Sequence, residues 1–184
     1  PDMVAAIVEG IGQFAVGEWS PLDKAGDSQG ARLENGVVRL PDGYAEAYAA
    51  YVAQGWNAVA GPEEFGGQGL PHVLGFVVEE FVATANQAWG MYPGLTAGAI
   101  SAILAKGSPE QQAKYLPKMI AGQWTGTMNL TEPHCGTDLG LIRTRAVPNA
   151  DGSYAISGTK IFISAGEHDL TENIIHLVLA KTPG

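Results

Sequence analysis

Apolar residues recur at helical spacing over roughly the first two-thirds of the chain. From His72 onward they repeat every three or four positions, whereas Glu79 and Glu80 face elsewhere. The repeating residues are Leu74, Val77, Val78, Phe81, Val82 and Ala85. This spacing predicts a helix with one side facing a core. The small and aliphatic stretch 98–106 carries no charge before Lys106, which predicts a helix buried on most sides at the centre of a bundle.

Local signals near residue 108 mark the start of another helix. Ser108 can act as the N-cap, Pro109 suits the first helical position, and Gln111 stands three residues after the cap. Gly122 supplies the stop. By contrast, residues 23–42 are rich in Gly, Asp and Ser with scattered apolar positions, so they predict an exposed loop.

After Gly122 the pattern changes to short β-branched or alternating runs separated by turn residues. The predicted strands cover 125–130, 142–147, 154–157, 160–164 and 174–180. Helices followed by strands indicate an α+β fold. We therefore expect an N-terminal helical bundle domain over 1–122 and part of an antiparallel β domain over 123–184, which is incomplete.

Composition narrows the classes of partner. The 184 residues include 19 acidic and 10 basic side chains, and the net charge of −9 disfavours nucleic acid and anionic lipid surfaces. The longest weakly polar run, 93–105, is shorter than the roughly 20 residues of a membrane span. A single cysteine excludes an internal disulfide framework and favours a reducing compartment, and no secretion signal is visible. We expect a cytoplasmic protein.

Residues 131–138 form a loop after a predicted strand. Pro133 removes one amide and Gly136 permits positive φ, so several amides can point outward. Such a group of amides suits the electron-rich edge of a ligand. The alternative is a turn in which Thr131, Thr137 and Asp138 satisfy their own backbone. The residues alone leave both interpretations open.

Ordered motifs give this loop a context. Residues 130–138 read L-T-E-P-x-x-G-[ST]-D, and residues 158–164 read G-x-K-x-[WF]-I-[ST]. Upstream, 61–69 is similar to P-E-x-x-G-G-x-G and 108–116 to G-[ST]-x-E-Q-x-x-x-Y-L-P. In this order the motifs resemble the acyl-CoA dehydrogenase family. The insertion 167–173 resembles that of a longer bacterial subgroup of the family.

The resemblance implies an FAD site built from two stretches of backbone. Residues matching contacts to the pyrimidine side of the flavin are Met128, Leu130 and Thr131, followed by Gly136 and Thr137. Phe162 takes the position of an aromatic residue that stacks on the flavin, and Ser164 that of a hydroxyl near flavin N5. As alternatives, Phe162 is a residue of the sheet core and Ser164 a cap at the end of a strand.

The same resemblance implies oxidation of an acyl-CoA thioester to the 2-enoyl-CoA, with electrons passed to an electron-transfer flavoprotein by a homo-oligomeric enzyme. The family's catalytic Glu lies in a C-terminal helical domain that is absent here, so we assign no catalytic residue within 1–184. Two alternatives remain: an acyl-CoA oxidase or flavin monooxygenase of the same superfamily, or a cofactor-free helical interaction module.

His134 and Cys135 occupy loop positions that are usually small in this family. Neighbouring residues of an extended chain point to opposite sides, so we expect neither a nucleophile–base pair nor a shared metal ion. The four histidines show no spacing typical of metal ligands. We expect no metal site.

Overall fold

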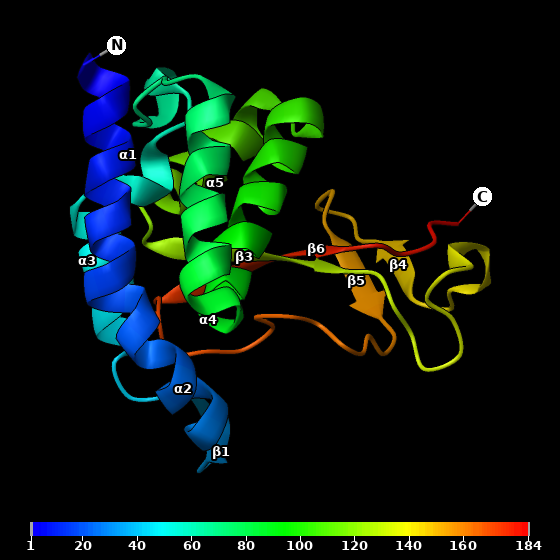
Figure 1. The fold of residues 1–184 in the computed structure, drawn as a ribbon. Coiled ribbons are helices and arrows are strands. Elements are labelled where there is room, and N and C mark those ends of the chain that lie inside the picture. Colours follow the sequence, from blue (N-terminus) through cyan, green and yellow to red (C-terminus); the bar gives the residue numbers. More distant parts are fainter. Residues whose placement is uncertain (1, 184) are drawn as a thin grey trace.

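The computed structural model describes residues 2–183. Its helices gather at one end and a small hairpin lies at the other, with two long strands running between them (Figure 1). The α-helices are α1 (Asp2–Phe14), α2 (Ser20–Gln29), α3 (Tyr44–Ala53), α4 (His72–Lys106) and α5 (Pro109–Ile120). The strands are β1 (Arg32–Glu34), β2 (Val37–Arg39), β3 (Trp124–Asn129), β4 (Arg145–Pro148), β5 (Tyr154–Ser157) and β6 (Asn173–Val178). Shorter helical turns are η1 (Ala15–Trp19), η2 (Trp56–Ala58), η3 (Glu63–Phe65) and η4 (Leu139–Leu141).

The helix predicted from His72 is confirmed and continues to Lys106 with one break. Asn86 has non-helical φ and ψ of −163° and 84°. Its Oδ1 accepts a hydrogen bond from the Trp89 amide at 2.9 Å, which is the contact an N-cap makes, so the helix restarts there. Leu74, Val78 and Val82 of the predicted apolar face are buried.

The prediction that stretch 98–106 is buried on most sides is wrong. Within it, Ala99 and Ile103 are buried, whereas Ser101, Ala102 and Ala105 are exposed. Helix α4 packs against α5 and β3 as well as against α1, α2 and η1, but these contacts leave Ser101, Ala102 and Ala105 exposed. The apolar residues of 98–106 therefore predict more burial than the structure shows.

Helix α5 begins and ends as its local sequence predicts. Ser108 Oγ accepts from the Gln111 amide at 3.3 Å, and the Ser108 amide donates to Gln111 Oε1 at 2.8 Å. Gly122 follows the helix with φ of +70°, a conformation that residues with a side chain rarely adopt.

Most of residues 23–42 are exposed, as predicted, but the prediction that they form a loop is wrong for most of the segment. Residues 20–29 form α2, and β1 pairs antiparallel with β2 across the turn at Asn35 and Gly36, whose φ angles are 52° and 82°. A two-residue Asn-Gly turn favours a hairpin of this kind. Helix α2 has few apolar residues: Leu22 packs against the core, and the buried Gly26 lies against the hydroxyl end of Tyr44.

Two apolar clusters hold the chain together. The larger contains aromatic rings of η1, α3 and α4 that meet in tilted or edge-on pairs, and Trp19 and Trp89 within it are fully buried. The smaller joins α4 and α5 around Leu116 and Met119, and Ile175 and Leu177 of β6 pack against it. This second cluster attaches the β3–β6 pair to the helices.

The α+β class is confirmed, but the strands are not all antiparallel. β4 pairs antiparallel with β5 as expected, from Arg145 opposite Ser157 to Pro148 opposite Tyr154. β3 and β6 instead run parallel, with Trp124 opposite Asn173, and the intervening residues form the long crossover that a parallel pair requires. The strand predicted over 160–164 is also wrong: the segment is irregular, and Phe162 has a φ of 57°.

Residues 167–172 of the insertion 167–173, which precede β6, connect the sheet region to the helical region. His168 Nε2 lies 2.9 Å from the Thr125 hydroxyl, and its ring meets Tyr92 edge-on. Asp169 accepts hydrogen bonds from the Leu40 amide and from the Arg39 guanidinium, each at 3.3 Å. We call this segment the clasp.

The clasp holds His168 as a neutral ring. Its Nδ1 accepts a hydrogen bond from the Leu170 amide at 3.2 Å, so the ring proton of the neutral form is on Nε2 and is donated to Thr125. Burial lowers the pKa of His168; Glu167 and Asp169 oppose this shift and His176 adds to it. Protonation would remove the acceptor that Leu170 uses.

Acidification should therefore weaken the fold through His168. Because its pKa is lower in the folded chain, the unfolded chain takes up the proton first, and the stability is full above the unfolded pKa of about 6.5 and is lost as pH falls below it. Urea unfolding at about pH 7.5 and about pH 5.5 checks this. The free energy of unfolding that His168→Gln removes should be larger at the higher pH. His72→Gln, in the exposed first turn of α4, is the control; an equal effect of His168→Gln at both pH values would contradict the prediction.

Candidate functional site

The loop after β3 is a tight turn. The Glu132 amide donates to the Cys135 carbonyl at 2.8 Å, and the Cys135 amide donates to the Glu132 carbonyl at 3.1 Å. Pro133 occupies a position in this turn where no amide is used. Gly136 then passes close to Thr131, since a Cβ on Gly136 would lie 3.2 Å from Thr131 Cγ2. The structure thus brings two predicted flavin-contacting residues, Thr131 and Gly136, together.

The buried carboxylate of Glu132 organises this region. Its Oε2 accepts from the Arg143 amide at 2.7 Å, and its Oε1 accepts from the Thr144 amide at 3.0 Å and from Lys160 Nζ at 3.0 Å. Burial acts to raise the pKa of Glu132, but the hydrogen bonds from Thr144, Arg143 and Lys160 together outweigh it and hold that pKa well below the ordinary range. Glu132 is therefore a charged acceptor that joins three segments.

Lys160 connects the second predicted stretch to the first. Its Nζ donates to the Leu130 carbonyl at 2.8 Å as well as to Glu132, and its side chain is 9% exposed. The next residue, Ile161, donates its amide to the Thr131 carbonyl at 2.9 Å. Stretches 128–137 and 158–164 are therefore neighbours in space. Sequence reasoning assigned no role to Lys160.

The predicted aromatic residue lies on the surface of this chain. Phe162 is 89% exposed, so it is not part of a sheet core. Ser164 stands at the start of a turn and not at the end of a strand. Met128 is an exposed residue of β3. Within residues 2–183, no hydrogen bond links the side chain of Thr137 or Ser164 to the rest of the site.

Of the three side chains that could bond the backbone of their own turn, Thr131, Thr137 and Asp138, only Asp138 does so in the described residues. Asp138 Oδ1 accepts from the Gly140 amide at 3.0 Å and caps η4. The Thr131 amide, in contrast, has no acceptor within residues 2–183, although the Thr131 carbonyl is bonded. The amides of His134, Gly136, Thr137 and Asp138 likewise have no acceptor within residues 2–183, so several amides of this loop remain available to a ligand, as the sequence predicts.

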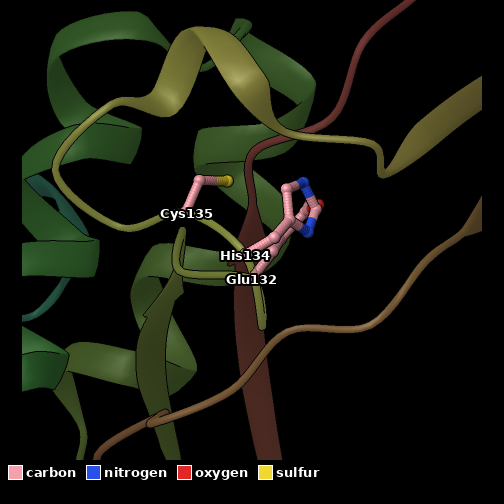
Figure 2. A group of neighbouring side chains, drawn as sticks. All are labelled: Glu132, His134 and Cys135. Atoms are coloured by element: carbon pink, nitrogen blue, oxygen red, sulfur yellow. The ribbon is translucent and has the colours of Figure 1, made fainter.

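His134 and Cys135 do not point apart as the extended-chain argument predicted. Because the chain turns at Pro133, both side chains rise from the same turn beside Glu132 (Figure 2), and one potential ligand atom from each of the three residues lies within 4.8 Å of the others. The charges disfavour a metal ion here, since Glu132 already accepts from two amides and from the Lys160 ammonium. His134 Nε2 lies 3.0 Å from the Leu141 carbonyl, which can only accept, so this nitrogen carries a proton.

A groove of about 400 Å³ lies along α4 and is lined by residues of the helical region, among them Tyr51, Trp56, Val82 and Met119. Thr96 also lines the groove, and its hydroxyl oxygen accepts a hydrogen bond from the Gly126 amide of β3 at 3.1 Å. Neither of the two predicted flavin-contacting stretches lines this groove. It is a feature of the helical region and is separate from the Glu132–Lys160 site.

Comparison with known proteins identifies the family. Residues 6–123 match the family described as acyl-CoA dehydrogenase, N-terminal domain. The chain belongs to the acyl-CoA dehydrogenase family. This match covers the helical region and ends at the start of β3.

Curated relatives extend the match across the sheet region. A 3-methylmercaptopropionyl-CoA dehydrogenase from Ruegeria pomeroyi is 54% identical over 182 residues, which are 99% of this chain and 31% of that protein. A butyryl-CoA dehydrogenase from Syntrophomonas wolfei is 38% identical over 167 residues, which are 89% of this chain and 27% of that protein. The chain thus spans about a third of the length of the curated relatives it matches. The Ruegeria relative agrees with the subgroup that the 167–173 insertion resembles.

Solved structures share the fold. Butyryl-CoA dehydrogenase from Megasphaera elsdenii superposes with a TM-score of 0.80 at 22% identity, covering 100% of this chain and 45% of that one. An acyl-CoA dehydrogenase from Bacillus anthracis, solved as a complex with FAD, gives 0.79 at 25% identity, covering 99% and 29%. In the described part of this chain, no helix is long and apolar enough to cross a bilayer.

Proposed function

We propose that this chain is the N-terminal portion of an FAD-dependent acyl-CoA dehydrogenase, which oxidises an acyl-CoA thioester to the 2-enoyl-CoA. Residues 1–122 form its helical domain and 123–184 part of its β domain. The observation that carries the proposal is the pairing of stretches 128–137 and 158–164, which leaves the Thr131 amide unbonded and Phe162 exposed. The relative from Ruegeria and the FAD complex from Bacillus anthracis support it.

The residues of this site fit a flavin. A backbone N–H without a partner suits a flavin carbonyl oxygen, and an exposed aromatic ring offers a face for stacking. The assigned contacts are Met128, Leu130, Thr131, Gly136, Thr137, Phe162 and Ser164. FAD supplies the hydride acceptor when it is bound, and these residues bind and orient it.

The base that removes the α-proton lies elsewhere in the complete enzyme. Glu132 is unsuited to the role because its carboxylate is buried, accepts three N–H donors and keeps a pKa below the ordinary range, so it is a weak proton acceptor. We further propose an acyl-CoA substrate, an electron-transfer flavoprotein as electron acceptor, a homo-oligomeric enzyme and a cytoplasmic location.

Truncating Phe162 tests the flavin site. In the complete enzyme, Phe162→Ala should reduce the FAD that remains after gel filtration and raise the Kd for FAD by at least about tenfold, because it removes an aromatic contact. Absorbance of the flavin relative to protein measures the effect. The matched control is Phe76→Ala, a ring on α4 that is 66% exposed, which should keep its FAD.

Equal FAD content in both variants would place Phe162 away from the cofactor. A wild-type enzyme that binds no FAD would refute the proposed function as a whole. Stopped-flow reoxidation of the reduced flavin by oxygen separates a dehydrogenase, which should react slowly, from an oxidase or monooxygenase.

A further inference from the structure

Two anchors fix the backbone on both sides of Thr131. Lys160 Nζ holds the Leu130 carbonyl at 2.8 Å, and the Ile161 amide holds the Thr131 carbonyl at 2.9 Å. These two carbonyls belong to the peptide planes before and after Thr131. The orientation of the Thr131 amide is therefore set by residues of the second stretch, about thirty positions further along the chain.

The Leu130 carbonyl and the Thr131 N–H belong to one peptide group. In a trans peptide these two groups point in opposite directions, so a donor that grips the carbonyl also aims the N–H. An ammonium on the carbonyl oxygen polarises the peptide and strengthens its N–H as a donor. The Thr131 N–H has no acceptor within residues 2–183, so this strengthened donor is free.

Lys160 is held in place for this task. Glu132 Oε1 takes a second N–H of the ammonium at 3.0 Å, and the side chains of Lys160 and Glu132 are 9% and 2% exposed. Because Glu132 is itself fixed by the Arg143 and Thr144 amides, the ammonium has a defined position. A buried ion pair contributes little net stability on average, which leaves room for a role in positioning.

We propose that Lys160 is a positioning residue for cofactor binding: through the Leu130 carbonyl it aims and polarises the Thr131 amide toward a carbonyl oxygen of the flavin. This inference rests on the proposed function, since it needs FAD at this site. It assigns a chemical task to the Lys of the G-x-K segment and to the Glu of the T-E-P segment as its support.

The test compares two lysines that make the same kind of contact. Lys181 Nζ donates to the Gly140 carbonyl at 2.8 Å, the same distance, but at a peptide outside the two stretches. Lys160→Met in the complete enzyme should raise the Kd for FAD about tenfold and shift the visible absorption band of the bound flavin. Lys181→Met should leave both unchanged.

Amide hydrogen exchange, which needs no cofactor, separates a loss of positioning from a loss of folding. The Arg143 and Thr144 amides should stay protected in Lys160→Met, which shows that the loop remains folded. If that variant does not fold, Lys160→Arg takes its place: the planar guanidinium keeps the charge but cannot reproduce the compact Nζ contact with both acceptors, so the flavin band should still shift.

Superimposable flavin spectra and equal Kd values for Lys160→Met and Lys181→Met would overturn the inference while leaving the proposed function standing. Absence of FAD from the wild-type enzyme would instead remove the proposed function and this inference together. A raised Kd with an unchanged flavin spectrum in a folded variant would also count against it, because general loosening of the loop would then explain the weaker binding.

Discussion

Gly67→Ala should destabilise the chain by about 3 kcal/mol, because it forces a side chain into backbone. A Cβ on Gly67 would overlap the carbonyl carbon and oxygen of Gly61 and would lie 2.5 Å from its Cα. The two residues cannot separate cheaply, since the Gly61 carbonyl accepts the Gly69 amide and the Gly67 amide donates to Pro62, both at 2.9 Å. Segment 61–69 therefore needs glycine at position 67, where its backbone crosses itself at Gly61.

Two other glycines separate the steric effect from the conformational one. Gly66 has a φ of +91° and open space around it, so Gly66→Ala should cost about 1–2 kcal/mol through strain alone. Gly17 lies in the helical turn η1, and a Cβ there would have no atom within 4 Å. Gly17→Ala should therefore leave the free energy of unfolding unchanged or raise it by about 0.5–1 kcal/mol. Urea unfolding of the three variants measures the order. A Gly67→Ala chain as stable as Gly66→Ala would show that the crossing can open.

Elements that depend on neighbouring residues could be predicted from the sequence. Helix α5 begins with Ser108 and Gln111 bonding to each other, and both residues lie within one turn. The apolar spacing after His72 likewise required no distant partner. In both cases the physical cause of the element is contained in the segment itself.

Elements that depend on distant partners could not be predicted. The direction of β6 relative to β3 is decided by the path of the chain between them, and an alternating pattern is the same in parallel and antiparallel strands. In helix α2 the buried residue is Gly26, which lies against Tyr44, and a glycine contact leaves no apolar pattern in the sequence. Segment 160–164 has the β-branched and aromatic residues typical of a strand, but the positive φ of Phe162 and the side-chain bonds of Lys160 hold it in an irregular path.

The sequence singled out two stretches as a candidate flavin site but did not predict the contacts that join them. The structure places these stretches side by side, with Thr131 and Gly136 close together beside Ile161. The Glu132–Lys160 pair was missed because its members are 28 residues apart. A signal existed: each is the sole charged residue in its surroundings, Glu132 within 124–137 and Lys160 within 154–166, and their charges are opposite. Two isolated opposite charges in otherwise uncharged segments favour a buried pair.

Trp89 is the residue on which the aromatic core most depends. Its side chain is fully buried, its ring lies 5.2 Å from Trp19 and 5.4 Å from Tyr51, and its Nε1 donates to the Tyr44 carbonyl at 3.2 Å. Helix η1 and helices α3 and α4 therefore meet at one side chain. Truncation there leaves a cavity that rigid neighbouring rings cannot fill.

Trp89→Ala should reduce the free energy of unfolding by about 3–5 kcal/mol, a large share of the total for a chain of this size. Trp89→Phe should reduce the free energy of unfolding by less, because most of the ring contacts remain. Its main cost is the hydrogen bond to the Tyr44 carbonyl. Trp19→Phe is the matched comparison: the Trp19 Nε1 is buried without a partner in the described residues, so removing it relieves a desolvation cost and should offset part of the lost packing. Chemical unfolding followed by circular dichroism measures all three. If Trp89→Ala cost no more than Trp19→Phe, the helices would be held together by contacts other than this aromatic cluster.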